Sequence, residues 1–139
     1  MGIGGLSVYW VTPLLAWLVA QLVKVMLAAF TGGFRGARPM FFSSGNMPSS
    51  HSAICLSVLT VIAGLEGLQS PEFGIMFTFT AITLYDAVNV RRAVGEQGLV
   101  LQELVKNKKF YTALGHKPTE VIVGGALGVA VGLVMLQIL

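Results

Sequence analysis

Charged residues are scarce in this chain. Only 11% of its 139 residues are Asp, Glu, Lys or Arg, whereas 55% are hydrophobic, and the mean hydropathy is +0.79. A soluble domain of this length would carry about 25% charged residues. The composition therefore excludes an ordinary soluble domain and predicts an integral membrane protein. The length allows one domain, which we expect to cover residues 1–139.

Cysteine and metal-ligand patterns are almost absent. The single Cys55 lies in an apolar run, so an internal disulfide is excluded and a small buried hydrophobe is expected. No cluster of histidines and carboxylates has a clear metal-ligand spacing, so we predict no metal and no cofactor. Nucleic acid is not among the expected partners. No basic stretch precedes the first apolar run, which indicates a retained helix rather than a signal peptide.

Apolar runs long enough to cross a membrane predict an all-α bundle of about four transmembrane helices. A span needs roughly 20 residues, and strands are not expected because an open sheet edge cannot face lipid. The segment 34–50 is predicted to be a loop, and the polar segment 98–117 a helical connector. The four predicted spans are Leu6 to about Phe30, His51 to about Leu68, Phe73 to about Glu96, and Val121 to Leu139.

Basic residues lie on one side of the predicted bundle. All nine Lys and Arg fall in or near the two segments that join spans one to two and three to four. The opposite side carries Glu66 and Glu72 and no basic residue. The positive-inside rule therefore predicts that the basic side faces the cytoplasm and that both termini lie on the opposite side, in a bacterial inner membrane or an organellar membrane.

Three glycines recur at four-residue spacing in the last span: Gly124, Gly128 and Gly132. Small residues at this spacing let helix backbones approach closely. The spacing does not tell whether the partner helix belongs to the same chain or to a second copy, so a homodimer through this face is one expectation.

A hydroxyl-rich segment, 43–53, runs directly into the second span. A loop that ends at a helix start offers free backbone N–H groups and the positive end of the helix dipole, which suits phosphate-like anions. Ser49 and Ser50 are therefore candidate phosphate ligands, and His51 adds a group that exchanges a proton near neutral pH.

The second histidine, His116, also lies at the entrance of a span. Glu120 follows four residues later, so helical spacing places a carboxylate beside the ring, where it would fix the tautomer. A lone histidine is more often structural than catalytic. Two histidines at equivalent helix entrances favour chemistry.

Asp86 interrupts the third span. A carboxylate within a membrane span costs free energy and therefore usually has a functional role. At about 100° per residue, Asp86, Asn89, Arg92 and Glu96 share one broad stripe, with Arg91 on the opposite side. This pattern favours Arg92 as the inward guanidinium. The alternative is that Asp86 and Arg92 only satisfy each other and hold the bundle together.

The basic residues of the first span and the first loop can each be interpreted in two ways. Lys24 shares a helix face with Gln21, which favours an inward ammonium that faces phosphate, but a lysine near a helix end also snorkels to the interface. Arg38 precedes Pro39 in the first loop; it and Arg35 could equally bind anionic lipid headgroups.

These motifs together resemble a known family. Met47-Pro48-Ser49-Ser50-His51, then Asp86 with Arg91-Arg92 and Gly95-Glu96-Gln97, then Gly115-His116 with Glu120, are similar to the divergent branch of the type-2 phosphatidic acid phosphatase and vanadium haloperoxidase superfamily. The likeness covers nearly the whole chain. Four features depart from the parent motifs: Ser50 replaces Gly, Glu120 replaces Asp, Lys24 is not at the parent spacing from Arg38, and the arginine at 91 or 92 is far more than five residues from His116.

The resemblance implies metal-independent hydrolysis of a phosphate monoester. His116 would attack phosphorus to form a phosphohistidine, with Glu120 orienting it, and His51 would protonate the leaving alcohol. Lys24, Arg38, Ser49, Ser50 and either Arg91 or Arg92 would cradle the phosphoryl oxygens, with Asp86 and Asn89 as a supporting polar network. The expected substrate is a phosphorylated lipid among the membrane lipids. A non-catalytic binder of anions or lipid headgroups, or a small solute carrier, are the alternatives.

Overall fold

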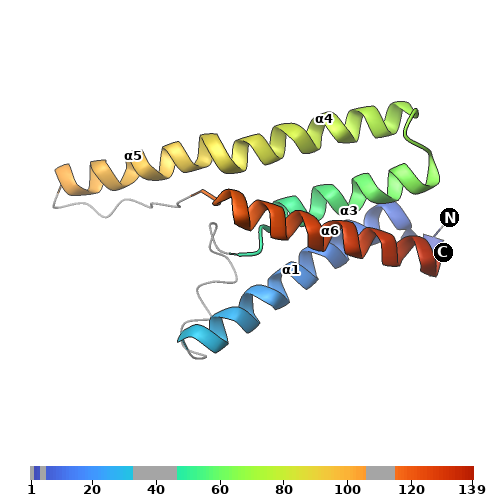
Figure 1. Ribbon diagram of the computed structural model, residues 1–139, viewed down its shortest axis with the longest axis horizontal. Helices are drawn as coiled ribbons and strands as arrows, with labels where there is room; N and C mark the ends of the chain where they lie inside the picture. Colours follow the sequence, from blue (N-terminus) through green and yellow to red (C-terminus); the bar gives the residue numbers. More distant parts are fainter. Residues whose placement is uncertain (1, 4–5, 33–46, 106–114) are drawn as a thin grey trace.

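The computed structural model describes residues 2–3, 6–32, 47–105 and 115–139, and these form a helical bundle. A long helical rod runs beside three shorter helices, and the two chain termini lie together at one end (Figure 1). The elements in chain order are β1 (Gly2–Ile3), β2 (Leu6–Ser7), α1 (Val8–Gly32), α3 (Ser50–Leu65), α4 (Pro71–Tyr85), the π-helix η1 (Asp86–Val90), α5 (Arg91–Leu104) and α6 (Pro118–Ile138).

The predicted all-α membrane bundle is confirmed. Three helical segments are long and apolar enough to cross a membrane, namely 8–30, 71–104 and 118–138. Helix α3, with 16 residues, is shorter at about 24 Å. It contacts α1, α4 and α6 and so lies at the centre of the bundle. The prediction that strands are absent misses one small pairing, because β1 and β2 form a two-residue antiparallel ladder before α1.

The third predicted span is longer than the sequence indicated. Helices α4 and α5 join through η1 into one continuous segment of 34 residues, which is about 51 Å long. A hydrocarbon core is only about 30 Å thick. The α5 part therefore projects beyond the rest of the bundle, as Figure 1 shows.

Helix starts follow standard capping chemistry. The Ser49 hydroxyl accepts the backbone N–H of Ser52 and begins α3, and the Ser70 hydroxyl accepts that of Phe73 and begins α4. Helix α6 begins at Pro118, whose missing N–H is not needed in the first turn. These caps fix where α3 and α6 enter the bundle, and so fix the histidines next to them.

The glycines of α6 pack against α3 of the same chain. A Cβ atom added at Gly124 would lie 2.2 Å from the Ser49 carbonyl oxygen, and one added at Gly128 would lie 2.3 Å from that of Ala53. Gly132 likewise meets Ser57 and Thr60 of α3. The close approach that this spacing predicts is therefore made within the chain, between α6 and α3.

Replacing Gly128 by alanine tests this packing. The added methyl group would collide with the α3 backbone, and overpacking of this kind costs about 1–3 kcal/mol. We expect Gly128→Ala to lower the thermal unfolding midpoint of the detergent-solubilised protein by several degrees. The control is Gly74→Ala, where nothing lies within 4 Å of the added Cβ. Equal midpoints for Gly128→Ala and the wild type would contradict the packing.

Candidate functional site

The two histidines lie side by side although 64 positions separate them in the sequence. His51 stands in the first turn of α3, and His116 immediately precedes α6. Their ring centroids are 6.5 Å apart. The Ser49 N–H donates to the Glu120 carbonyl at 3.0 Å, which ties the two helix entrances together. Both rings are therefore within reach of a single phosphate-sized group.

His116 is held by a carboxylate in a buried position. Its Nδ1 lies 3.0 Å from Oε2 of Glu120, and its side chain is only 3% exposed. The same carboxylate oxygen accepts the backbone N–H of Lys117 at 3.1 Å. This arrangement places the proton on Nδ1 and leaves the lone pair of the neutral ring on Nε2. Such an Nε2 atom can act as a nucleophile or a base.

Serine hydroxyls line the entrance of α3. The Ser49 Oγ accepts from the Ser52 hydroxyl at 2.9 Å, and both side chains are buried, as is that of Ser50. As an acceptor in these bonds, Ser49 keeps its own O–H to donate to a ligand. Ser52 was not among the residues singled out from the sequence; its position three residues after a capping serine was the available signal.

Lys24 points into the bundle rather than towards the interface. Its side chain is 4% exposed, and its ammonium group interacts electrostatically with Glu120 and His51. A charge buried this far from water requires a charged or polar partner. The structure thus buries Lys24 within electrostatic range of His51 and Glu120, in agreement with the prediction that its ammonium group points inward.

Arg91, not Arg92, is the arginine that pairs with Asp86. Arg91 acts electrostatically on the His51 ring, and its Nε donates to Oδ2 of Asp86. Arg92 instead pairs with Glu96, at 3.0 Å. The predicted stripe assumed a regular α-helix, in which Asp86 and Arg91 lie on different faces. The π-helix η1 widens the turn after Asp86, so that Arg91, five positions later, lies on the same face as Asp86. A pairing of Asp86 with Arg92 is therefore wrong.

Of two other candidates, Asn89 does not contact Asp86 in the structure, and Arg38 is not among the described residues. The Asn89 side chain is exposed, and its amide donates to the Tyr85 carbonyl at 3.3 Å, so its predicted place in a network with Asp86 is not seen. Arg38 lies outside the described residues, as do Arg35 and the three lysines between positions 106 and 109. The hydroxyl-rich segment is described from Met47 onwards.

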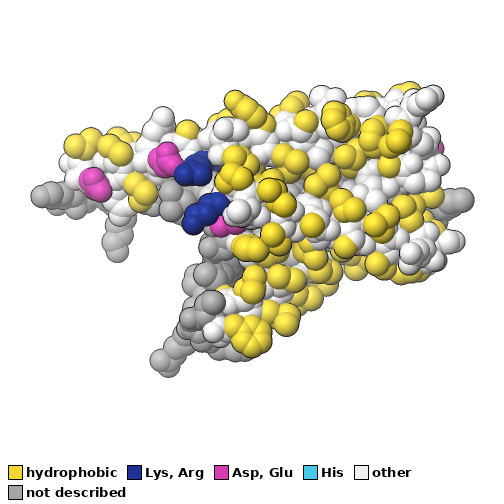
Figure 2. All heavy atoms as spheres, in the orientation of Figure 1, with side chains coloured by type: hydrophobic (Ala, Val, Ile, Leu, Met, Phe, Trp, Pro, Cys, Tyr) yellow, Lys and Arg dark blue, Asp and Glu magenta, His cyan; other side chains and the backbone are white. Residues whose placement is uncertain are grey.

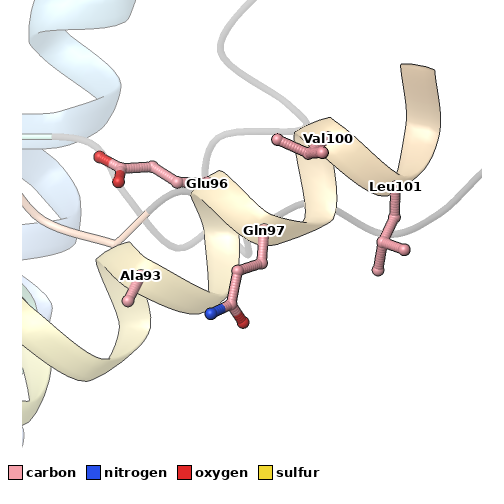
Figure 3. Close-up of a pocket in the computed structure, with 5 residues that line it drawn as sticks. All are labelled: Ala93, Glu96, Gln97, Val100 and Leu101. Carbon is pink, nitrogen blue, oxygen red and sulfur yellow. The ribbon is translucent and has the colours of Figure 1, made fainter. Parts of the chain in front are cut away.

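The charged side chains are concentrated where α5 leaves the bundle. On the face in Figure 2, basic and acidic groups gather around this junction, while most of the remaining surface is hydrophobic. A pocket of about 570 Å³ opens on α5, and its described lining contains neither histidine. Figure 3 shows the five lining residues, which are Ala93, Glu96, Gln97, Val100 and Leu101.

No metal-binding cluster occurs among the residues that the structure describes: no three His, Cys, Asp or Glu side chains come together there. The groups that do converge are two imidazoles, an ammonium, a guanidinium and serine hydroxyls, together with the carboxylates of Glu120 and Asp86, which are bonded to His116 and Arg91. This set suits an oxyanion, because it combines positive charge with hydrogen-bond donors. The fold and the cluster thus define a membrane-embedded helical protein with a polar site between two helix entrances.

Comparison with known proteins identifies the family. The sequence profile of the Divergent PAP2 family matches residues 7–131, and the chain belongs to this family. An uncharacterized membrane protein of Bacillus subtilis (strain 168), YuiD, is 35% identical over 144 aligned positions, which cover 89% of this chain and 90% of the relative. No solved structure matches the chain significantly.

The tautomer of His116 provides a test of the site that does not depend on function. We expect the ¹⁵N shifts of the neutral ring to show a protonated Nδ1 and a bare Nε2, because Glu120 accepts from Nδ1. In Glu120→Ala the carboxylate is lost, and the Nε2–H form, which predominates in free histidine, should appear. His51 serves as the internal control, since its ring shifts should change less. A wild-type ring with Nε2–H predominant would contradict the geometry.

Proposed function

We propose that the protein is a metal-independent phosphatase that removes phosphate from a phosphorylated membrane lipid. The observation that supports this most strongly is the paired rings of His51 and His116 at 6.5 Å, with Glu120 bonded to the second. Phosphoryl transfer needs a nucleophile and a proton donor in line, with positive charge around the equatorial oxygens. The cluster contains a candidate for each part.

The two half-reactions assign one role to each ring. The Nε2 lone pair of His116 attacks phosphorus, the P–O bond to the lipid breaks, and His51 gives its proton to the leaving alcohol. Glu120 keeps the proton on Nδ1 and stabilises the charge that develops on the ring. In the second half-reaction, neutral His51 takes a proton from water, the resulting nucleophile attacks the phosphohistidine, and phosphate leaves with Nε2 free again.

Positive charge around the phosphate comes from several elements. Lys24 on α1 and Arg91 at the start of α5 act electrostatically on His51, and Ser49 and Ser50 add donors at the entrance of α3. Arg38 and Arg92 are the further candidates from the sequence. The α3 start contributes its helix dipole to the same point.

The site is proposed to face the cytoplasm, with both termini on the other side of the membrane. The support is the distribution of the nine basic residues, none of which lies in the α3–α4 turn. Figure 1 places both termini at the end where that turn lies, opposite the α6 entrance. The substrate would then be a lipid phosphate of the inner leaflet.

A second candidate function is the binding of an anion or lipid headgroup without turnover. One observation favours it: Arg91 of the cluster and its neighbour Arg92 already have carboxylate partners, Asp86 for Arg91 and Glu96 for Arg92. Each pairing reduces the charge available to a transition state. Binding of phosphate or vanadate with no phosphate release would distinguish this function from catalysis. For a solute carrier, Asp86 would have to exchange its Arg91 partner for the cargo.

Phosphate release in detergent tests the proposed function. With a chelator present, we expect the wild type to hydrolyse at least one member of a panel of lipid phosphates. His116→Ala should abolish release, and His51→Ala should lower kcat by about 10²–10⁴-fold, the usual contribution of a general acid. Thr78→Ala, at an exposed position of α4, is the control.

Two results would refute the phosphatase. One is the absence of release by a folded wild type from every member of the panel. The other is undiminished release by His116→Ala. Saturable vanadate binding together with the first result would support the non-catalytic binder.

A further inference from the structure

The π-helix η1 stands at the site but has no role in the mechanism above. We propose that η1 is a positioning element, which holds the backbone of His116 and sets the arginine that pairs with Asp86. This inference rests on the proposed function, because it assigns η1 a part in that reaction. The evidence for this inference consists of backbone hydrogen bonds as well as side-chain contacts.

The backbone hydrogen bonds of η1 explain how it can hold another segment. In an α-helix the N–H of Arg91 would donate to the carbonyl of Ala87, four residues earlier. Here it donates to Asp86, five residues earlier. The Ala87 carbonyl thereby loses its α-helical partner, and a buried carbonyl requires another one. It accepts the N–H of His116 at 3.1 Å.

The residue before His116 shows how close this contact is. A Cβ atom added at Gly115 would lie 2.3 Å from the backbone nitrogen of Arg92 and 2.7 Å from the carbonyl carbon of Arg91. Only glycine allows the chain to reach η1 at this distance. The segment that carries His116 is therefore fixed to the rod of α4 and α5, and not only to α6.

The same wide turn sets the side-chain register. In a regular α-helix Asp86 and Arg91 would be about 140° apart around the axis. With the π-helix between them they form an ion pair, and the guanidinium acts electrostatically on His51. A π-turn that only accommodated one extra residue would not need to produce both the Ala87–His116 backbone bond and the Asp86–Arg91 ion pair.

Amide exchange and steady-state kinetics of the whole protein test the inference. We expect the His116 amide of the wild type to exchange at least tenfold more slowly than an unprotected amide. In Gly115→Ala the methyl group must push the segment away from η1, so protection should be lost and kcat should fall at least tenfold with KM within twofold. Gly74→Ala is the matched control and should change neither quantity, because its added Cβ meets nothing.

Deletion of Val88 is a second variant, in case Gly115→Ala does not fold. It makes the helix regular: Asp86 and Arg91 become four apart and stay paired, while Ala87 regains an α-helical partner in Arg92. The His116 amide should then lose its protection, and kcat should fall although the ion pair remains. A variant that fails to fold is excluded by its circular dichroism and elution profile.

The outcomes separate this inference from the proposed function. An unprotected His116 amide in the wild type overturns it, as does lost protection with unchanged kcat in an active enzyme. A wild type without phosphatase activity refutes the function alone. If the wild type is inactive, a His116 amide that is protected in the wild type and exposed in both variants supports the contact between η1 and His116. A His116 amide that stays protected in both variants overturns the inference.

Discussion

Helices α3 and α6 approach so closely that the Ser49 N–H donates to the Glu120 carbonyl at 3.0 Å. This contact requires Gly124, whose missing side chain leaves room for the Ser49 carbonyl. It also fixes the two entrances at which His51 and His116 stand. Without it the capping serine would be separated from the carboxylate that holds His116. The candidate site is thus a consequence of backbone packing inside the bundle.

Polar groups in a membrane protein of this size must satisfy one another, because lipid offers no hydrogen bonds. Lys24 is buried with Glu120 near it, Asp86 pairs with Arg91, and Arg92 pairs with Glu96. These groups come from different helices and are concentrated at one end of the bundle. Apolar contacts dominate elsewhere, as in the cluster of Val8, Val61 and Met135.

Much of this arrangement could be predicted from the sequence, because it depends on local spacing. The four helices follow from hydropathy, the His116–Glu120 contact from a four-residue interval, and the close helix contact from the spacing of Gly124 and Gly128. The choice of Arg91 over Arg92 could not be predicted. It depends on a π-turn, in which the Ala87 carbonyl accepts the N–H of His116 from another part of the chain. Helical periodicity alone contains no information about such a partner.

A phosphoenzyme intermediate would test the central claim, that one site is assembled from two helix entrances. The measurement is rapid quenching of the protein with a lipid phosphate labelled on phosphorus, followed by localisation of the label within the chain. The account predicts a phosphohistidine at His116 that forms and decays as phosphate is released. It also predicts that His51→Ala slows the formation of this intermediate. Phosphate release with the label on another residue, or with no labelled enzyme at any time, would contradict it.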